Sequence, residues 1–178
     1  MRSMWSWARA YGSAALAVGM VAAGPAVAPV EANTPTGGVS CAGTNTIGFS
    51  PGLSLRARRT RITGTGSYRC TSAADPGLTA GTSEISGGGV NGCFASDATT
   101  VEKITWSTGE RSVVVYPMGD VRQVAAQAVV LVVGKVVSGR FHGRTVASPG
   151  VQLALDVSSC ATDRGVQRIS GPSALLIP

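Results

Sequence analysis

Between residues 58 and 70 the chain alternates between two kinds of side chain. Ile62, Tyr68 and Cys70 fall on one side with two glycines, while arginine, threonine and serine residues fall on the other. A period of two over this length is typical of a half-buried β-strand, because successive side chains of a strand point to opposite faces of the sheet. The glycines at 64 and 66 on the inner side indicate a bend or a close approach of another backbone. This segment therefore favours a fold in which a sheet buries one face.

The rest of the chain repeats apolar runs between turn-forming groups such as Asp75-Pro76-Gly77 and Ser148-Pro149-Gly150. Further strands are predicted over residues 101–106, 112–116, 124–137, 140–146, 151–157 and 166–177. The valine-rich run at 124–137 is predicted to be a strand buried on both faces, with a buried helix as the alternative. We therefore predict an all-β fold, a single antiparallel β-barrel or β-sandwich of about eight strands.

The first 32 residues have the layout of a secretory signal peptide. Arg2 and Arg9 precede an apolar run at residues 14–23, and small residues follow. The apolar run is shorter than the ~20 residues that a membrane-spanning helix needs. We expect cleavage before Asn33, a flexible leader over residues 33–40, and a β domain over residues 41–178 without a transmembrane segment. The mature protein is expected to be secreted, either free outside the cell or associated with the cell wall.

Four cysteines lie in the expected β domain, at positions 41, 70, 93 and 160. An even number in an exported chain predicts two disulfides, for which three connectivities exist. A hairpin that turns near Leu55 and Arg56 would place Cys41 opposite Cys70, so the pairs Cys41–Cys70 and Cys93–Cys160 are favoured. A zinc site is not expected, because the sequence has no Cys-x-x-Cys pair and a single histidine.

Arginines dominate the charge of the expected mature chain. Loss of residues 1–32 removes Arg2, Arg9 and Glu31 and lowers the net charge from +6 to +5. This surplus favours encounters with anionic polymers or surfaces.

Arg59, Arg61 and Arg69 share one face of a strand and are candidates for binding an anionic envelope polymer. Nucleic acid is an unlikely partner because aromatic residues for base stacking are sparse nearby. The alternative is a charged, exposed edge that discourages strand addition.

His142, the only histidine, lies between Arg140 and Arg144 at a spacing of two. On a strand the three side chains would share a face and could hold a phosphate or carboxylate. The alternative is the solvent side of a strand. Trp106 is a candidate ligand platform, although a tryptophan in a strand is more often part of the core. Glu102 is expected at a rim.

Four segments carry a resemblance to a known group. They are FSPGL at 49–53, TGTGSYRC at 63–70, TWSTGERS at 105–112 and VSGRFHG at 137–143. Together they resemble a group of uncharacterised, secreted actinobacterial proteins of about this length. The resemblance implies an exported, disulfide-bonded β domain and transfers no functional residues.

No complete set of catalytic residues is recognisable, and no cofactor or metal is expected. A nucleophile elbow and a phosphate-binding loop are both missing from the sequence. The first hypothesis is a secreted, non-catalytic β domain that binds an envelope polymer, a small ligand or a protein. The alternative is an enzyme in a barrel mouth that uses His142 with an acid such as Glu102, and a weaker one is a secreted protease inhibitor.

Overall fold

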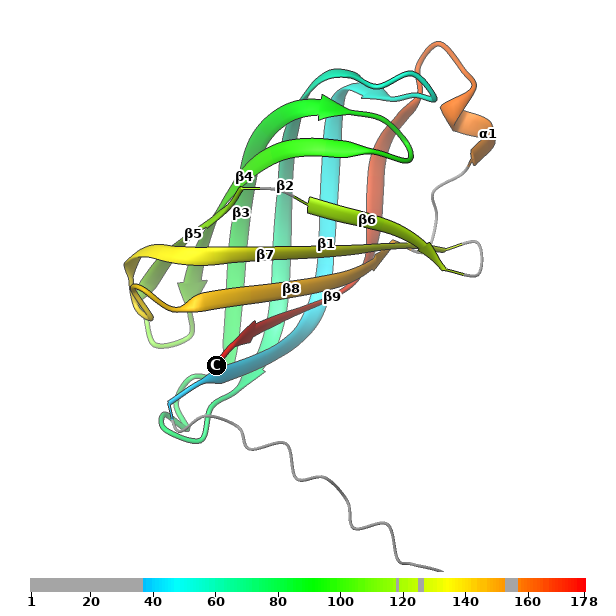
Figure 1. The fold of residues 1–178 in the computed structure, drawn as a ribbon. Helices are drawn as coiled ribbons and strands as arrows, with labels where there is room; N and C mark the ends of the chain where they lie inside the picture. Colours follow the sequence, from blue (N-terminus) through cyan, green and yellow to red (C-terminus); the bar gives the residue numbers. More distant parts are fainter. Residues whose placement is uncertain (1–36, 118, 125–126, 153–156) are drawn as a thin grey trace, which may run out of the picture. The chain divides into compact units, whose positions relative to one another are not determined.

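The computed structural model describes residues 37–117, 119–124, 127–152 and 157–178, which form strands and one short helix (Figure 1). The elements are β1 (Val39–Leu53), β2 (Arg58–Thr71), β3 (Ala80–Asn91), β4 (Ser96–Trp106), β5 (Arg111–Tyr116), β6 (Gly119–Val124), β7 (Gln127–Gly139), β8 (Thr145–Gln152), α1 (Val157–Cys160) and β9 (Val166–Ile177). The predicted all-β class is confirmed. The first strand begins at Val39, inside the segment expected to be a flexible leader, and the expected signal peptide lies outside the described residues.

The strands follow one another as an antiparallel meander that closes on itself. Their order is β5-β4-β3-β2-β1-β9-β8-β7-β6, and β5 also pairs with β7. On β7, β5 pairs with residues 135–139 and β6 pairs with residues 127–132. Strands β5 and β6 thus lie end to end along one edge of β7, separated by Pro117, which has no backbone N–H to donate. The outcome is a closed eight-stranded antiparallel barrel, the first of the two predicted architectures.

Alternation of small or apolar side chains with polar ones determines which face of each strand lines the barrel. On β2, Ile62, Tyr68 and Cys70 are buried, while Arg61 and Arg69 are exposed. Their neighbours across the sheet follow the same parity, because the register pairs Cys41 with Cys70 and Tyr68 with Gly81. The strands whose side chains the structure describes therefore contribute every second side chain to one shared interior.

One end of the barrel, which we call the closed end, carries the turns at residues 72–79, 107–110 and 140–144. Most of the main apolar cluster fills it, including Trp106, Leu78 and Leu175. The Trp106 ring meets the Phe141 ring edge-on, with 5.7 Å between centroids. Arg140 joins the three turns, because its guanidinium pairs with Asp75 at 2.9 Å and also with Glu110.

The opposite end, which we call the mouth end, carries the turns at residues 54–57 and 92–95 together with α1. Leu53, Cys93, Cys160 and Val166 form a second, smaller apolar cluster there. The Leu55 N–H donates to the Cys160 carbonyl at 3.1 Å, and the Cys93 N–H donates to the Ser54 carbonyl at 3.0 Å. The first bond joins α1 to the turn at 54–57, and the second joins the two turns to each other.

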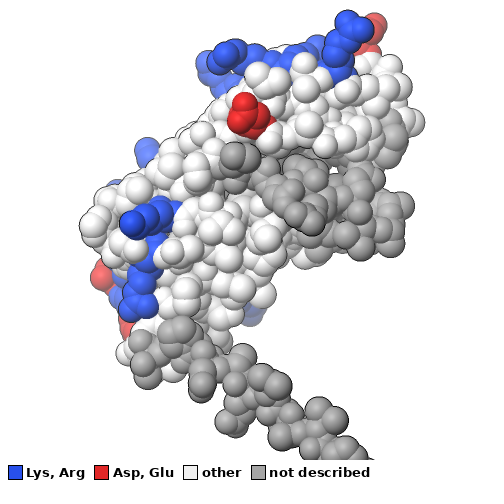
Figure 2. Space-filling model, viewed as in Figure 1, with Lys and Arg blue, Asp and Glu red and all other residues white. Residues whose placement is uncertain are grey.

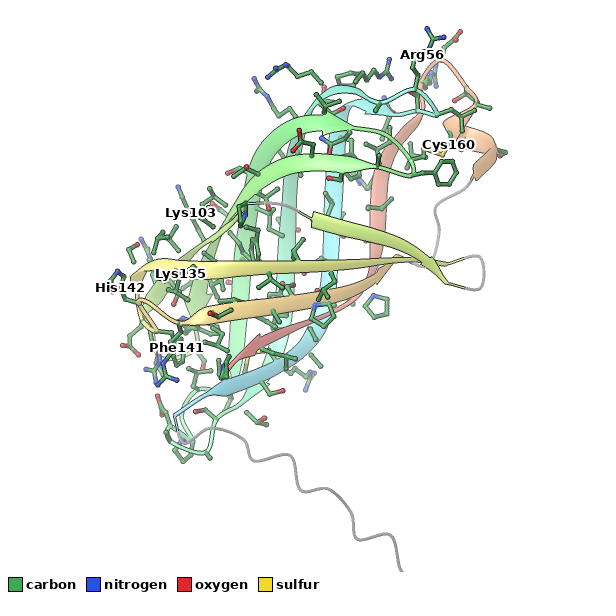
Figure 3. The ribbon with its side chains drawn as sticks, in the orientation of Figure 1. Arg56, Lys103, Lys135, Phe141, His142 and Cys160 are labelled. Atoms are coloured by element: carbon green, nitrogen blue, oxygen red, sulfur yellow. A yellow bond between two sulfur atoms is a disulfide. The ribbon has the colours of Figure 1, made fainter. Side chains whose placement is uncertain are left out.

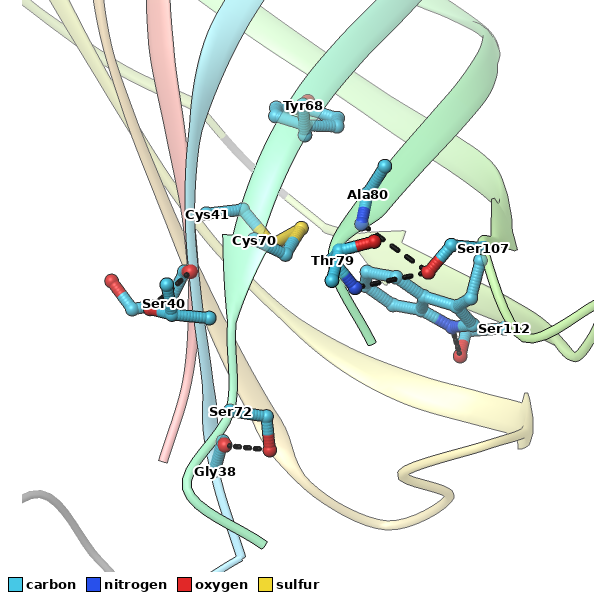
Figure 4. Close-up of a disulfide and its surroundings, with 12 residues drawn as sticks. Gly38, Ser40, Cys41, Tyr68, Cys70, Ser72, Thr79, Ala80, Ser107 and Ser112 are labelled. Atoms are coloured by element: carbon cyan, nitrogen blue, oxygen red, sulfur yellow. Dashed lines mark hydrogen bonds between the residues drawn. A yellow bond between two sulfur atoms is a disulfide. The ribbon is translucent and has the colours of Figure 1, made fainter. Parts of the chain in front are cut away.

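Both predicted disulfides are present. Cys41–Cys70 links neighbouring positions of β1 and β2 beside Tyr68 (Figure 4), and Cys93–Cys160 links the turn before β4 to α1. No cysteine is free. The pairing follows from the hairpin geometry, since β1 ends at Leu53 and β2 begins at Arg58 as the predicted turn required.

Three strand predictions differ from the structure. Residues 140–144 form a turn, because Gly139 and Gly143 adopt φ values of +80° and +83° and Phe141 between them adopts +64°. The run at 124–137 belongs to β6 and β7 on either side of residues 125–126, which lie outside the described residues. Leu131, Val133 and Val137 on β7 are exposed, so this run is not buried on both faces. The strand predicted at 151–157 ends at Gln152 in β8, and residues 153–156 lie outside the described part.

Candidate ligand cavity

A carboxyl group lies buried in the barrel interior between two tyrosines. Glu102 on β4 is 2% exposed, which corrects its expected position at a rim. The Tyr68 hydroxyl on β2 donates to Glu102 Oε1 at 3.0 Å, and the Tyr116 hydroxyl on β5 donates to Oε2 at 2.8 Å. Each carboxylate oxygen can accept about two hydrogen bonds. Both oxygens therefore keep the capacity to accept another.

The local sequence explains why these groups meet. Glu102 has the same parity as Ile104 and Trp106 on β4, so all three side chains point into the barrel. On β7, the position against Tyr116 is Gly134, where an added Cβ would lie 2.5 Å from the tyrosine ring. The missing side chain at Gly134 leaves the room in which the Tyr116 ring reaches Glu102.

Burial is the main reason why both tyrosines resist ionisation. Desolvation, followed by the negative charge of Glu102, raises the pKa of Tyr68 and of Tyr116 well above the ordinary value of 10.0. The side chains of Asn45 and Ser83 act on Tyr68 in the opposite direction but more weakly. Both hydroxyls consequently remain hydrogen-bond donors to Glu102 throughout the neutral range.

These shifts predict the behaviour of the folded protein in alkali. Without residues 1–32, Tyr68 and Tyr116 are the only tyrosines of the chain. The folded protein should therefore show little tyrosinate absorbance at pH values where free tyrosine, with a pKa of 10.0, is already ionised. Because the folded-state pKa is raised, the stability contribution is complete below pH 10 and is lost as the pH rises above it. Tyrosinate absorbance and circular dichroism, followed in parallel, should change together; an ordinary tyrosine titration in a protein with unchanged circular dichroism would contradict the assignment.

Further polar groups surround the carboxyl group. The Asn45 Nδ2 group donates to Ser173 Oγ at 3.1 Å, which joins β1 to β9. Asn45 Oδ1 and Ser83 Oγ are buried and have no hydrogen-bond partner among the described residues. Both atoms lie over Gly66, where an added Cβ would be 2.7 Å and 2.5 Å from them, respectively. Unpartnered buried polar atoms are costly in a folded protein, and of these two residues Asn45 lines the cavity, where its free oxygen can accept a hydrogen bond from a ligand group.

A cavity of about 160 Å³ extends from this polar floor toward the mouth end. Asn45, Glu102, Tyr116 and Ser173 line its floor. Its walls are mainly apolar and include Ile47, Phe49, Leu53, Ile62, Ile85, Ala98, Val132 and Ile169. Small residues leave room for the cavity. Inward positions at this level include Gly64, Gly66 and Ala98, and residues this small do not fill the interior of an eight-stranded barrel. Among the lining residues that the structure describes, none is basic.

The predicted arginine face lies outside the barrel. Arg59, Arg61 and Arg69 are all exposed on the outer side of β2, as their common parity required. Lys and Arg side chains gather at the end of the molecule where Figure 3 labels Arg56, as the space-filling view shows (Figures 2 and 3). None of the three lines the cavity.

The predicted group of His142, Arg140 and Arg144 does not assemble. His142 is exposed in the turn at the closed end, apart from the labelled mouth-end residues Arg56 and Cys160 (Figure 3). Arg140 is engaged by Asp75 and Glu110, and Arg144 Nη1 donates to the Pro178 carbonyl at 2.6 Å. Because these residues occupy a turn, they do not share the strand face that the spacing of two suggested. His142 and Glu102, the pair of the enzyme hypothesis, are not brought together in the cavity.

Trp106 takes the core position rather than that of a ligand platform. It is 2% exposed, and its Nε1 group donates to Ser112 Oγ at 2.9 Å. It belongs to the apolar cluster that seals the closed end and does not line the cavity.

Sequence reasoning missed Tyr68, Tyr116, Asn45 and Ser83 as site residues. Parity alone would have placed Tyr68 and Glu102 inside, because Tyr68 lies between Ser67 and Arg69 and Glu102 has the same parity as Ile104 and Trp106. A buried glutamate needs partners, and two inward tyrosines were available to supply them. Which strands face each other across a barrel is not written in any local pattern.

Among the described residues, no group of three or more His, Cys, Asp or Glu side chains could hold a metal ion, and no helix is long and apolar enough to cross a membrane. The two disulfides indicate an oxidising, non-cytoplasmic environment.

Comparison of the chain with protein-family models, with curated proteins and with solved structures found no match.

Proposed function

We propose that this protein is an exported binding protein that holds one small, largely apolar ligand inside its barrel. The observation that carries the proposal is the cavity of about 160 Å³, with apolar walls and a hydrogen-bonding floor around Glu102. Eight-stranded barrels either fill their interior with side chains or hold one small ligand. Apolar pockets with a few convergent polar groups are typical of small-molecule sites.

Export is part of the same proposal. The basic, apolar and small-residue order of residues 1–32 supports it. The Cys93–Cys160 disulfide, which joins the turn at 92–95 to α1, would hold the cavity rim in place outside the reducing cytosol.

The volume indicates the size of the ligand. A cavity of about 150 Å³ lined by apolar side chains is known to accommodate benzene. This cavity should therefore accept one aromatic ring or a short aliphatic chain with a polar substituent. A long acyl chain or a polymer segment would not fit within it.

A cavity-filling variant tests the proposal. Ala98 faces the cavity and is buried, so Ala98→Phe should fill part of the space and abolish binding of benzyl alcohol, a neutral one-ring probe. Thr99→Phe is the matched control, because Thr99 is the next residue on β4 and is exposed on the outer face. Calorimetric titration of the oxidised protein and of the Thr99→Phe variant should detect binding. The proposed function is refuted if benzyl alcohol binds neither of these two proteins, or if it binds Ala98→Phe as tightly as the unsubstituted protein.

A further inference from the structure

We infer that the ligand of this cavity carries a protonated amine, whose ammonium group is held by Glu102 and the polar atoms around it. The inference rests on the proposed function and adds to it the chemical class of the ligand head.

The buried negative charge of Glu102 favours a cationic ligand. Glu102 is buried with two neutral hydroxyl donors, and no Lys, Arg or His among the described residues forms an ion pair with it. A buried carboxylate without a cation is costly, whereas a charge-assisted hydrogen bond to a buried carboxylate is among the strongest polar interactions in proteins. A cationic ligand would supply the missing countercharge. An anionic ligand would add a second buried negative charge beside the first.

The polar atoms of the cavity floor that still lack a partner are hydrogen-bond acceptors. Glu102 keeps acceptor capacity on both oxygens, and Asn45 Oδ1 is a buried acceptor without a partner. An ammonium group has three N–H donors and no acceptor. It therefore matches a floor that offers acceptors better than a carbonyl or a carboxylate does.

The lining of the rest of the cavity indicates the chemistry of the ligand body. Beyond the polar floor the lining is mainly apolar, with Ile47, Ile62 and Ile169 among the wall residues. The ligand body should therefore be uncharged and apolar, with the amine at one end. The cavity volume of about 160 Å³ limits that body to one ring or a short chain.

Three one-ring probes of similar size test the inference: benzylamine, benzyl alcohol and benzoate, titrated calorimetrically into the oxidised protein at neutral pH. We expect benzylamine to bind at least about tenfold more tightly than benzyl alcohol, which corresponds to about 1.4 kcal/mol, and benzoate to bind least. In the Glu102→Gln variant the preference for benzylamine over benzyl alcohol should disappear. Glu84→Gln is the matched control, since Glu84 is exposed on the outer face of β3 and its loss changes the net charge equally. The control should keep the full preference.

The outcomes separate the two proposals. If benzyl alcohol binds as tightly as benzylamine and Ala98→Phe abolishes both, the proposed function stands and the amine inference is wrong. If none of the three probes binds, the proposed function fails with it. A preference for benzylamine that persists in Glu102→Gln would also overturn the inference, because the ammonium group would then be held by groups other than the Glu102 carboxylate. Should Glu102→Gln fail to fold, the order of affinities in the unsubstituted protein still tests the inference, because benzyl alcohol or benzoate binding as tightly as benzylamine would overturn it.

Discussion

Joint replacement of Cys93 and Cys160 by alanine is expected to lower the free energy of unfolding by about 4 kcal/mol. The two cysteines are 67 residues apart in sequence, so their bridge closes a long loop and removes much conformational freedom from the unfolded chain. Both cysteines are 2% exposed within the mouth-end cluster, and alanine avoids placing an unpaired hydroxyl there. Urea unfolding followed by circular dichroism measures the change, and the slope of the free energy against urea should increase because the uncrosslinked chain exposes more surface.

The pair Cys41 and Cys70 is the natural comparison. Its loop spans 29 residues, so removal of both cysteines should cost slightly less, about 3.5 kcal/mol. Cys41 and Cys70 are also already held opposite each other by the pairing of β1 with β2. A loss below about 1 kcal/mol for Cys93→Ala with Cys160→Ala would contradict a role for this bridge in stability.

The second large effect is expected at the closed end, where Trp106→Ala should lower the free energy of unfolding by about 3–5 kcal/mol. The substitution removes a fully buried ring from the main apolar cluster and leaves a cavity against Phe141. It also removes the indole N–H that donates to Ser112, a residue that itself donates to the Arg140 carbonyl at 2.6 Å. The contacts between the closed-end turns should therefore weaken together with the packing.

An aromatic residue at the opposite end serves as the control for Trp106. Phe94 is 47% exposed, so Phe94→Ala should cost less than about 1 kcal/mol. Both variants are measured by urea unfolding under the same conditions. Equal effects of the two substitutions, or a loss for Trp106→Ala below about 1 kcal/mol, would show that the closed end is not tightly packed around Trp106.

The fold could be predicted to a large extent because its determinants are local. Alternation along β2 and the turn residues at 75–77 depend only on neighbouring positions, and the pairing of Cys41 with Cys70 follows from where one turn falls. The prediction of a strand over residues 140–146 was wrong at residues 140–144, and the reason for the turn found there is also local. Gly139 and Gly143 bracket that turn in the sequence, and positive φ values at both are what glycine permits.

The candidate site could not be predicted in the same way. Each of its side chains has a local explanation for pointing inward, but Asn45, Tyr68, Glu102 and Tyr116 come from four different strands. Their contacts depend on how the meander closes and on the stagger between strands, which sum contributions from the whole chain.

The sequence by itself therefore predicted a sheet-built unit, favoured the two disulfide pairs that the structure contains, and indicated which side chains share the inner face of β2. Only the tertiary structure decided that β5 closes on β7, that the interior keeps a cavity, and that Glu102 lies on its floor rather than at a rim. The physical reason is that alternation and turn formation are set by neighbours in sequence, whereas the shape of a barrel interior is set by the closure of all its strands at once.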